Sequence, residues 1–116
     1  MLIQIEINSY ICIPFRTNIE HKYAFRFKNT RRSQKAKSGL DFTKIIVTDS
    51  TAYLGQDAIV DSDEYKQTRD NIETIKQKAI KYIKDYMFCK DKTQPKYKYS
   101  SLQYFDDILA KIISQL

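Results

Sequence analysis

The sequence predicts a single α+β domain, because its strand-like and helix-like patterns fall in separate halves of the chain. Apolar and polar side chains alternate in residues 3–7 and 22–28, which is the period-2 pattern of a half-buried strand. Between residues 65 and 87 the apolar positions recur at spacings of three, four and seven, which is typical of an amphipathic helix. The chain has 116 residues, of which 42% are hydrophobic. This is enough to fill one core but marginal for two.

Short strands and loops are predicted for the first sixty residues. The strands are expected, in order, at residues 3–7, 10–13, 22–28, 43–48 and 52–60, with a turn at Asn8 and Ser9. Pro14 has no N–H to donate to a ladder, so the second strand should end there and release residues 15–18 into a loop. Residues 29–39 are polar and basic, which indicates a second, longer loop.

One long helix is predicted to start at Asp61 or Ser62 and to run for about 26 residues. Asp63 and Glu64 would complement the helix dipole in its first turn. Its apolar stripe consists of Tyr65, Ile72, Ile75, Ala79, Tyr82, Ile83, Tyr86 and Met87. We interpret this stripe as a core-packing face, with a coiled-coil partner as the alternative.

A linker and a final helix are predicted for the C-terminal part of the chain. Residues 91–95 contain a proline and no apolar periodicity, so they are expected to be the linker. Ser100 or Ser101 can cap the last helix. Its apolar face is formed by Leu102, Phe105, Ile108, Leu109, Ile112 and Ile113.

Excess positive charge is confined to one quarter of the chain. The formal net charge is +6, and residues 16–44 hold nine basic side chains against two acidic ones. Residues 45–116 carry eleven of each sign. A local basic block attracts polyanions, because each neutralised phosphate releases counterions. The sequence therefore predicts a nucleic-acid partner, with a solvated basic loop as the alternative.

Several classes of protein are disfavoured by what the sequence lacks. The longest unbroken apolar runs have four residues, at positions 10–13 and 86–89, so neither a membrane span nor a secretory leader is expected. One histidine and two distant cysteines do not make a zinc site, and the two glycines form no nucleotide-binding motif. We therefore expect a cytoplasmic protein without metal or cofactor, in which Cys12 and Cys89 are buried, reduced thiols.

The loop after the second strand places Arg16, Thr17 and His21 within six residues of one another, at the start of the basic block. RNA can be cleaved without metal if a base takes the 2′-hydroxyl proton, an acid protonates the leaving 5′-oxygen and cations stabilise the phosphorane. Histidine changes charge near neutral pH, so His21 could act as acid or base. Arg16 and Lys44 offer fixed positive charge, and Thr17 could hold a phosphate oxygen or the nucleophilic hydroxyl. A purely structural histidine is the alternative.

Five segments resemble, in order, the toxins of type III toxin–antitoxin systems. The first is IPFRTNIEHKY at residues 13–23. It is similar to the TenpN branch of the ToxN/AbiQ/CptN family, whose motif is proline, leucine or phenylalanine, arginine, serine or threonine, asparagine, two variable residues and histidine. The others are SGLDFTK at residues 38–44, the strand at 45–48, the acidic-capped helix at 61–86 and SSLQYF at 100–105. The resemblance covers nearly the whole chain.

The resemblance implies a compact, twisted antiparallel β-barrel or sheet related to the MazF and Kid toxins, with one long helix and a C-terminal helix packed against it. It also implies a sequence-specific, metal-independent endoribonuclease that cuts single-stranded mRNA by 2′-hydroxyl attack and leaves a 2′,3′-cyclic phosphate. Family members are inhibited by a structured RNA antitoxin, a pseudoknot cut from a tandem repeat. Several form closed rings of alternating protein and RNA, and phage defence is the role that the family implies.

On the family pattern Thr17 occupies the hydroxyl position of the active site, with Arg16 and His21 beside it, and Lys44 is expected to contact a phosphate. Family chains normally carry a further segment before the strand that begins here at Leu2. The resemblance therefore implies that the single domain of residues 1–116 lacks the family's N-terminal segment, which contributes to the barrel and the RNA groove.

RNA binding is expected to use phosphate contacts and base stacking more than groove reading. The basic residues proposed for it are Lys22, Arg26, Lys28, Arg31, Arg32, Lys35 and Lys37. The stacking candidates are Tyr10, Tyr23 and Phe42, with a place in the core as the alternative for each. Phe25 and Phe27 are interpreted as core.

Two alternative functions stay open at this point. A non-catalytic nucleic-acid-binding module would use the same basic loop and treat His21 as structural. A protein-interaction domain would use the long helix, and its association would be insensitive to salt.

Overall fold

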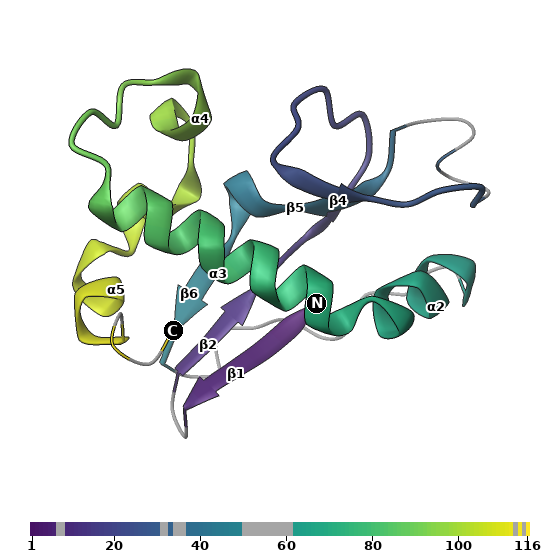
Figure 1. Cartoon of the computed structure of the whole chain (residues 1–116), viewed down its shortest axis with the longest axis horizontal. Coiled ribbons are helices and arrows are strands. Elements are labelled where there is room, and N and C mark those ends of the chain that lie inside the picture. The colour runs from purple at the N-terminus through teal and green to yellow at the C-terminus, as the bar shows by residue number, and fades with distance from the viewer. Residues whose placement is uncertain (7–8, 31–32, 34–36, 50–61, 113, 115) are drawn as a thin grey trace.

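The computed structural model describes residues 1–6, 9–30, 33, 37–49, 62–112, 114 and 116 as a compact α+β fold with two small antiparallel sheets (Figure 1). One sheet has the order β1 (Leu2–Glu6), β2 (Ser9–Cys12) and β6 (Ile46–Thr48). The other has the order β3 (Phe15–Arg16), β5 (Gly39–Asp41) and β4 (Ala24–Arg26). No closed barrel is found among these described strands. The predicted strand at 52–60, Asn8 and Asp61 lie outside the described residues.

A bent ribbon of two strand pairs joins the two sheets. β2 runs antiparallel to β6 with Ile11 opposite Val47, and β3 runs antiparallel to β5 with Phe15 opposite Leu40. Pro14 lies at the bend, and its carbonyl accepts a hydrogen bond from the Asp41 N–H at 3.1 Å. The predicted loop at residues 15–18 is wrong at its start, because pairing resumes directly after the proline.

The predicted strand at residues 43–48 also begins later than expected. Phe42–Lys44 form a 3₁₀ turn, η1, whose cap is the Asp41 side chain accepting from the Thr43 N–H at 2.9 Å. This local bond offers the backbone an alternative to the sheet ladder. Lys44 therefore leaves the sheet, and its Nζ donates to the Tyr99 carbonyl at 3.0 Å.

The predicted long helix is divided at Asn71 into α2 (Ser62–Asp70) and α3 (Ile72–Phe88). The Asn71 side-chain amide donates to the Gln67 carbonyl at 2.8 Å, and its own backbone leaves the helical conformation. The apolar stripe holds within α3, where Ile75, Ala79, Tyr82, Ile83 and Tyr86 are buried. Tyr65 and Ile72, expected in the same stripe, are 58% and 48% exposed.

After α3 the described residues form three short helical elements up to residue 112: α4 (Pro95–Lys98), the 3₁₀ turn η3 (Ser101–Tyr104) and α5 (Asp106–Ile112). Pro95 starts α4 inside the stretch expected to be a linker, since proline is favoured in the first helical turn. Ser100 is a cap, as predicted, because its Oγ accepts from the Leu102 N–H at 3.3 Å. The cap belongs to η3, so the last α-helix is shorter than predicted.

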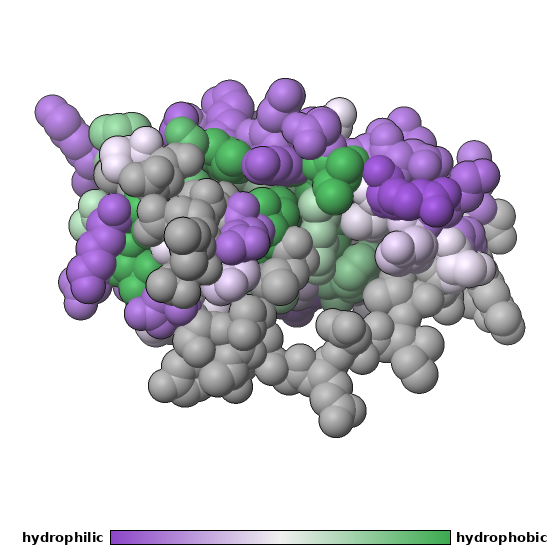
Figure 2. All heavy atoms as spheres, turned by 90° about the horizontal axis from the view of Figure 1, so that it is seen from below, coloured by the Kyte–Doolittle hydropathy of each residue, from purple (hydrophilic) through white to green (hydrophobic). Residues whose placement is uncertain are grey.

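One hydrophobic core joins both sheets to α3 and α5. It is built around the fully buried Ile11, Leu40, Ile75, Ile83 and Leu109. Phe27 belongs to it as predicted, and Phe42, a stacking candidate, is also in it at 4% exposure. Seen from below, hydrophobic side chains show in a band beneath a hydrophilic upper rim (Figure 2).

Two further expectations concern the thiols and the membrane. Cys12 and Cys89 are free thiols, but they are half-buried and not buried as expected. None of the helices that the structure describes is long and apolar enough to cross a bilayer.

Candidate functional site

A pocket of about 300 Å³ lies beside β3, the loop that follows it, η1 and the turn before η3. All four residues selected as catalytic candidates line it: Arg16, Thr17, His21 and Lys44. Tyr23, selected for base stacking, lines it too. Because β3 pairs with β5, the segment with Arg16 lies next to the segment that leads into Lys44. The pairing therefore brings the two halves of the predicted site together.

A buried acid, Asp41, organises this pocket. Its Oδ1 accepts from the Thr43 N–H at 2.9 Å and from the Thr43 hydroxyl at 2.6 Å. The same oxygen lies 3.2 Å from His21 Nε2, and Oδ2 lies 3.9 Å from Arg16 Nε. Asp41 is only 4% exposed, so its carboxylate is largely removed from water. The two hydrogen bonds from Thr43 hold this carboxylate between His21 and Arg16. Sequence reasoning missed this role, because Asp41 was counted only as one acid within a basic block.

Both ring nitrogens of His21 have partners. Nδ1 accepts from the Tyr23 N–H at 3.1 Å, so in this arrangement it carries no proton. The neutral ring then has its proton on Nε2, which faces Asp41 and lies 3.4 Å from Thr43 Oγ1. The ring also stacks on Tyr23, with 5.9 Å between centroids. These contacts fix the tautomer and orientation, and the ring has to release one of them before it can exchange a proton with a bound molecule.

Lys96 of α4 adds a positive charge that the sequence did not indicate. Its Nζ lies 5.5 Å from the Tyr23 ring centroid and 3.5 Å from Asp85 Oδ2. Burial disfavours the charged form, but contacts with Tyr97 and Asp85 outweigh it and raise the pKa of the Lys96 ammonium. Behind it, burial raises the pKa of Tyr82 to about 12, and this phenol donates to the Lys96 carbonyl at 3.0 Å. The lysine therefore stays charged in a fixed position.

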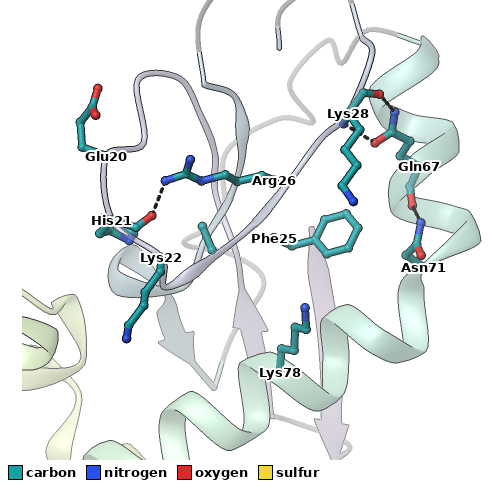
Figure 3. Close-up of a pocket in the computed structure, with 10 residues that line it drawn as sticks. Glu20, His21, Lys22, Phe25, Arg26, Lys28, Gln67, Asn71 and Lys78 are labelled. Carbon is teal, nitrogen blue, oxygen red and sulfur yellow. Dashed lines mark hydrogen bonds between the residues drawn. The ribbon is translucent and has the colours of Figure 1, made fainter.

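A second cavity, of about 720 Å³, adjoins the first, since Glu20 and His21 line both. Its lining comes from β4 and the loop before it and from α2 and α3 (Figure 3). Three of the predicted RNA-binding residues line it, namely Lys22, Arg26 and Lys28. Lys78 of α3 joins them, although sequence reasoning assigned that helix to core packing or to a protein partner. The Arg26 guanidinium donates to the His21 carbonyl at 2.6 Å, which ties the cavity to the pocket.

The helix break at Asn71 positions one wall of this cavity. Gln67 accepts from the Lys28 N–H through Oε1 at 3.0 Å and donates from Nε2 to the Lys28 carbonyl at 2.5 Å. The Asn71 amide donates in turn to the Gln67 carbonyl (Figure 3). The two Gln67 bonds pair with both the N–H and the carbonyl of Lys28, as a backbone partner in a sheet would, and they attach the chain after β4 to α2.

Two other predicted binding residues that the structure describes, Lys37 and Tyr10, line neither cavity. Lys37 is near the cavities, because its Nζ donates to Glu20 Oε2 at 2.9 Å, and this contact lowers the pKa of the Glu20 carboxyl. Tyr10 lies in β2 opposite Thr48, in the other sheet. Arg31, Arg32 and Lys35 lie outside the described residues.

No family model matches the chain, and no curated protein or solved structure is significantly similar to it. Within the part of the chain that the structure describes, no three His, Cys, Asp or Glu side chains gather as metal ligands would. A functional assignment therefore depends on the chemistry of the two cavities themselves.

Proposed function

We propose that this protein is a metal-independent endoribonuclease toxin that cleaves single-stranded RNA by 2′-hydroxyl attack and is inhibited by a structured RNA antitoxin in the cytoplasm. One observation carries the proposal: Arg16, Thr17, His21 and Lys44 line one pocket, and that pocket opens beside a cavity rich in cations. A reacting phosphate needs acid–base and cationic groups close together, as in the pocket, and an RNA backbone needs a row of cations, as in the cavity. The bent ribbon between the sheets is compatible with the twisted barrel of the toxin family that the sequence resembles.

Stabilisation of the phosphorane is assigned to the cations and the hydroxyl of the pocket. Attack by the 2′-oxygen places extra negative charge on the non-bridging oxygens of the phosphate. Arg16 can bind two of these oxygens through its planar guanidinium, and Lys44 supplies a second charge from η1. Thr17 is exposed and can donate its hydroxyl to one of them. Fixed charges of this kind cost no reorganisation during the reaction.

Proton transfer is assigned to His21, with Asp41 as its positioning residue. The 2′-hydroxyl loses a proton as its oxygen bonds to phosphorus, and the 5′-oxygen gains one as its bond to phosphorus breaks. One proton is therefore taken and one is given, and the ring can do both only in sequence or with a second group. Entry of RNA has to displace the Tyr23 amide from Nδ1 or turn Nε2 away from Asp41.

A second candidate function is an RNA-binding module that does not cut. The observation that favours it is the engagement of both His21 nitrogens by protein groups. Under either function the cavity that takes a substrate strand also takes an antitoxin RNA, because both present phosphates and unpaired bases.

The test is cleavage of a mixed-sequence RNA in excess EDTA by the wild type, Thr17→Ala and His21→Ala, with the cut ends mapped. We expect ends carrying 2′,3′-cyclic phosphate, and rates reduced by about 10²-fold or more in both variants, while RNA binding is retained. Thr74→Ala is the matched control, since Thr74 is exposed on α3 and lines neither cavity.

The alternatives give distinct results in the same assay. Binding by the wild type without any cutting would overturn the nuclease and favour the binding module. Absence of binding at low salt would overturn both, because each depends on phosphate contacts.

A further inference from the structure

We propose that the larger cavity is a nucleotide subsite, in which Phe25 stacks on one unpaired nucleobase and the surrounding cations hold the flanking phosphates. The inference deepens the proposed function and rests on it for the identity of the ligand as RNA. The shared chemistry is an unstacked nucleotide of single-stranded RNA, whether it belongs to a substrate or to an antitoxin.

Phe25 is an aromatic platform with its position fixed by the core. It is half-buried and lines the cavity, and it packs edge-on against Phe27 with 6.1 Å between centroids and 78° between planes. Phe27 is 5% exposed and stacks in turn on Phe15 at 5.9 Å. The Phe25 side chain therefore loses little conformational entropy when a base stacks on it. Stacking contributes more affinity under that condition. Sequence reasoning favoured a core role for Phe25, and the ring does pack against the core while it lines the cavity.

Cations surround this ring. The Lys78 ammonium lies 5.9 Å from the Phe25 centroid, and Lys28 approaches the ring from the opposite side (Figure 3). In the described part of the chain no carboxylate pairs with Lys22, Lys28 or Lys78. Like charges gathered around one cavity repel one another, so an anionic ligand relieves that repulsion when it binds.

Among the described residues that line the larger cavity, Glu20 is the one acid, and its charge is already paired. Glu20 binds Lys37 at 2.9 Å, so it opposes an incoming phosphate less than a free carboxylate would. A volume of about 720 Å³ falls among cavities that hold drug-sized ligands, roughly 300–1,000 Å³, so it accommodates a nucleotide. Because His21 lines both cavities, the nucleotide on Phe25 adjoins the phosphate in the smaller pocket.

A single-tryptophan reporter tests the stacking directly. The chain contains no tryptophan, so Phe25→Trp introduces the only one. The ligand is a short 2′-O-methyl oligouridine, which has no 2′-hydroxyl to attack and is bound without being cut. We expect saturable quenching of the tryptophan by at least about a third, and much weaker quenching by an abasic oligonucleotide of the same length.

The control reporter is Phe88→Trp, because Phe88 is 76% exposed at the end of α3 and lines neither cavity. Its fluorescence should change little on addition of either oligonucleotide. Equal quenching of both reporters, equal quenching by the abasic ligand, or anisotropy-detected binding without quenching at Phe25→Trp would each overturn the subsite.

Two further variants test the subsite without the reporter. Phe25→Leu should weaken binding of the oligouridine by about 5- to 100-fold, the range expected for loss of one stacked base. Lys78→Gln should reduce the salt dependence of binding by about one released counterion, while Lys111→Gln, exposed on α5, should leave it unchanged. The same slope for both lysine variants would contradict the proposal.

The outcome separates this inference from the proposed function. Quenching at Phe25→Trp, with no cleavage of ordinary RNA by the wild type, keeps the subsite and rejects the nuclease. If the wild type cleaves RNA, and Phe25→Leu and Lys78→Gln cleave it at the same rate and the same positions, the nuclease is kept and the subsite is rejected.

Discussion

The two sheets each have three short strands, but they differ in the kinds of side chain that they bury. The sheet β1-β2-β6 contributes Ile3, Ile11 and Val47 to the core, and none of these is more than 7% exposed. The sheet β3-β5-β4 buries the carboxylate of Asp41 and exposes Arg16. Both sheets contribute to the core, because Leu40 of β5 is also fully buried, but the second sheet in addition carries a buried carboxylate next to an exposed arginine. The division predicts that substitutions in the two sheets will affect different properties.

The largest effect on stability is expected in the first sheet. Ile11 is fully buried on the central strand β2, so Ile11→Ala should lower the free energy of unfolding by about 2–5 kcal/mol. Arg26→Ala, on an exposed position of β4, should lower it by no more than about 1 kcal/mol, because it removes one exposed hydrogen bond to the His21 carbonyl. Urea unfolding followed by circular dichroism measures both. A loss for Arg26→Ala as large as that for Ile11→Ala would refute the division between the sheets.

Gly39 is the position where the second sheet should respond to packing. A Cβ placed there would overlap the Phe25 carbonyl oxygen and lie 3.0 Å from the Arg26 Cα. These are backbone atoms, so Gly39→Ala must move β4 away from β5. We expect a loss of about 1–3 kcal/mol in unfolding free energy, together with faster amide exchange in β4 than in β2.

The exchange measurement is the more specific of the two. Uniform acceleration across both sheets would mean that Gly39→Ala destabilises the fold as a whole and that the sheets are not separable. Unchanged exchange throughout would mean that β4 and β5 are not as close as the contact at Gly39 requires.

Local sequence patterns predicted what depends on neighbours along the chain. The burial of Ile75, Ala79 and Ile83 follows from their spacing of four residues, because that spacing places them on one face of a helix. Arg16 and Thr17 are adjacent, so their sharing of one pocket was a reasonable expectation. The pairing of β3 with β5 brings Lys44 to the same pocket, although no local pattern could place this candidate cation beside Arg16.

Features that depend on distant partners could not be predicted. Asn71 has an ordinary helix propensity, and it interrupts the helix where Gln67 is occupied with the chain after β4. In the sequence Asp41 cannot be told apart from a surface acid, and only the tertiary fold shows that it is buried against His21. Lys78 belongs to the half of the chain with no net charge, so a charge count could not place it in the larger cavity.

The smallest expected effect on stability is at Glu20, where a substitution should still change RNA binding measurably. Glu20 is exposed and lines both cavities, and the hydrogen bond and charge of Lys37 lower the pKa of its carboxyl, so it is ionised at neutral pH. Glu20→Gln should leave the urea midpoint unchanged, because exposed ion pairs contribute little. It should tighten binding of the 2′-O-methyl oligouridine about two- to fivefold at low salt, since one repulsive charge is removed and Lys37 becomes available to a phosphate.

The matched control for this prediction is Glu73→Gln, which removes the same charge from an exposed position on α3 outside both cavities. Its effect on binding should be smaller, because a distant exposed charge is screened by salt. The salt dependence should become steeper for Glu20→Gln alone, by about 0.7 for one additional phosphate contact of a single strand. Equal tightening by both variants would show that RNA responds only to net charge, and weaker binding by Glu20→Gln would show that the Glu20–Lys37 pair holds the loop in its binding conformation.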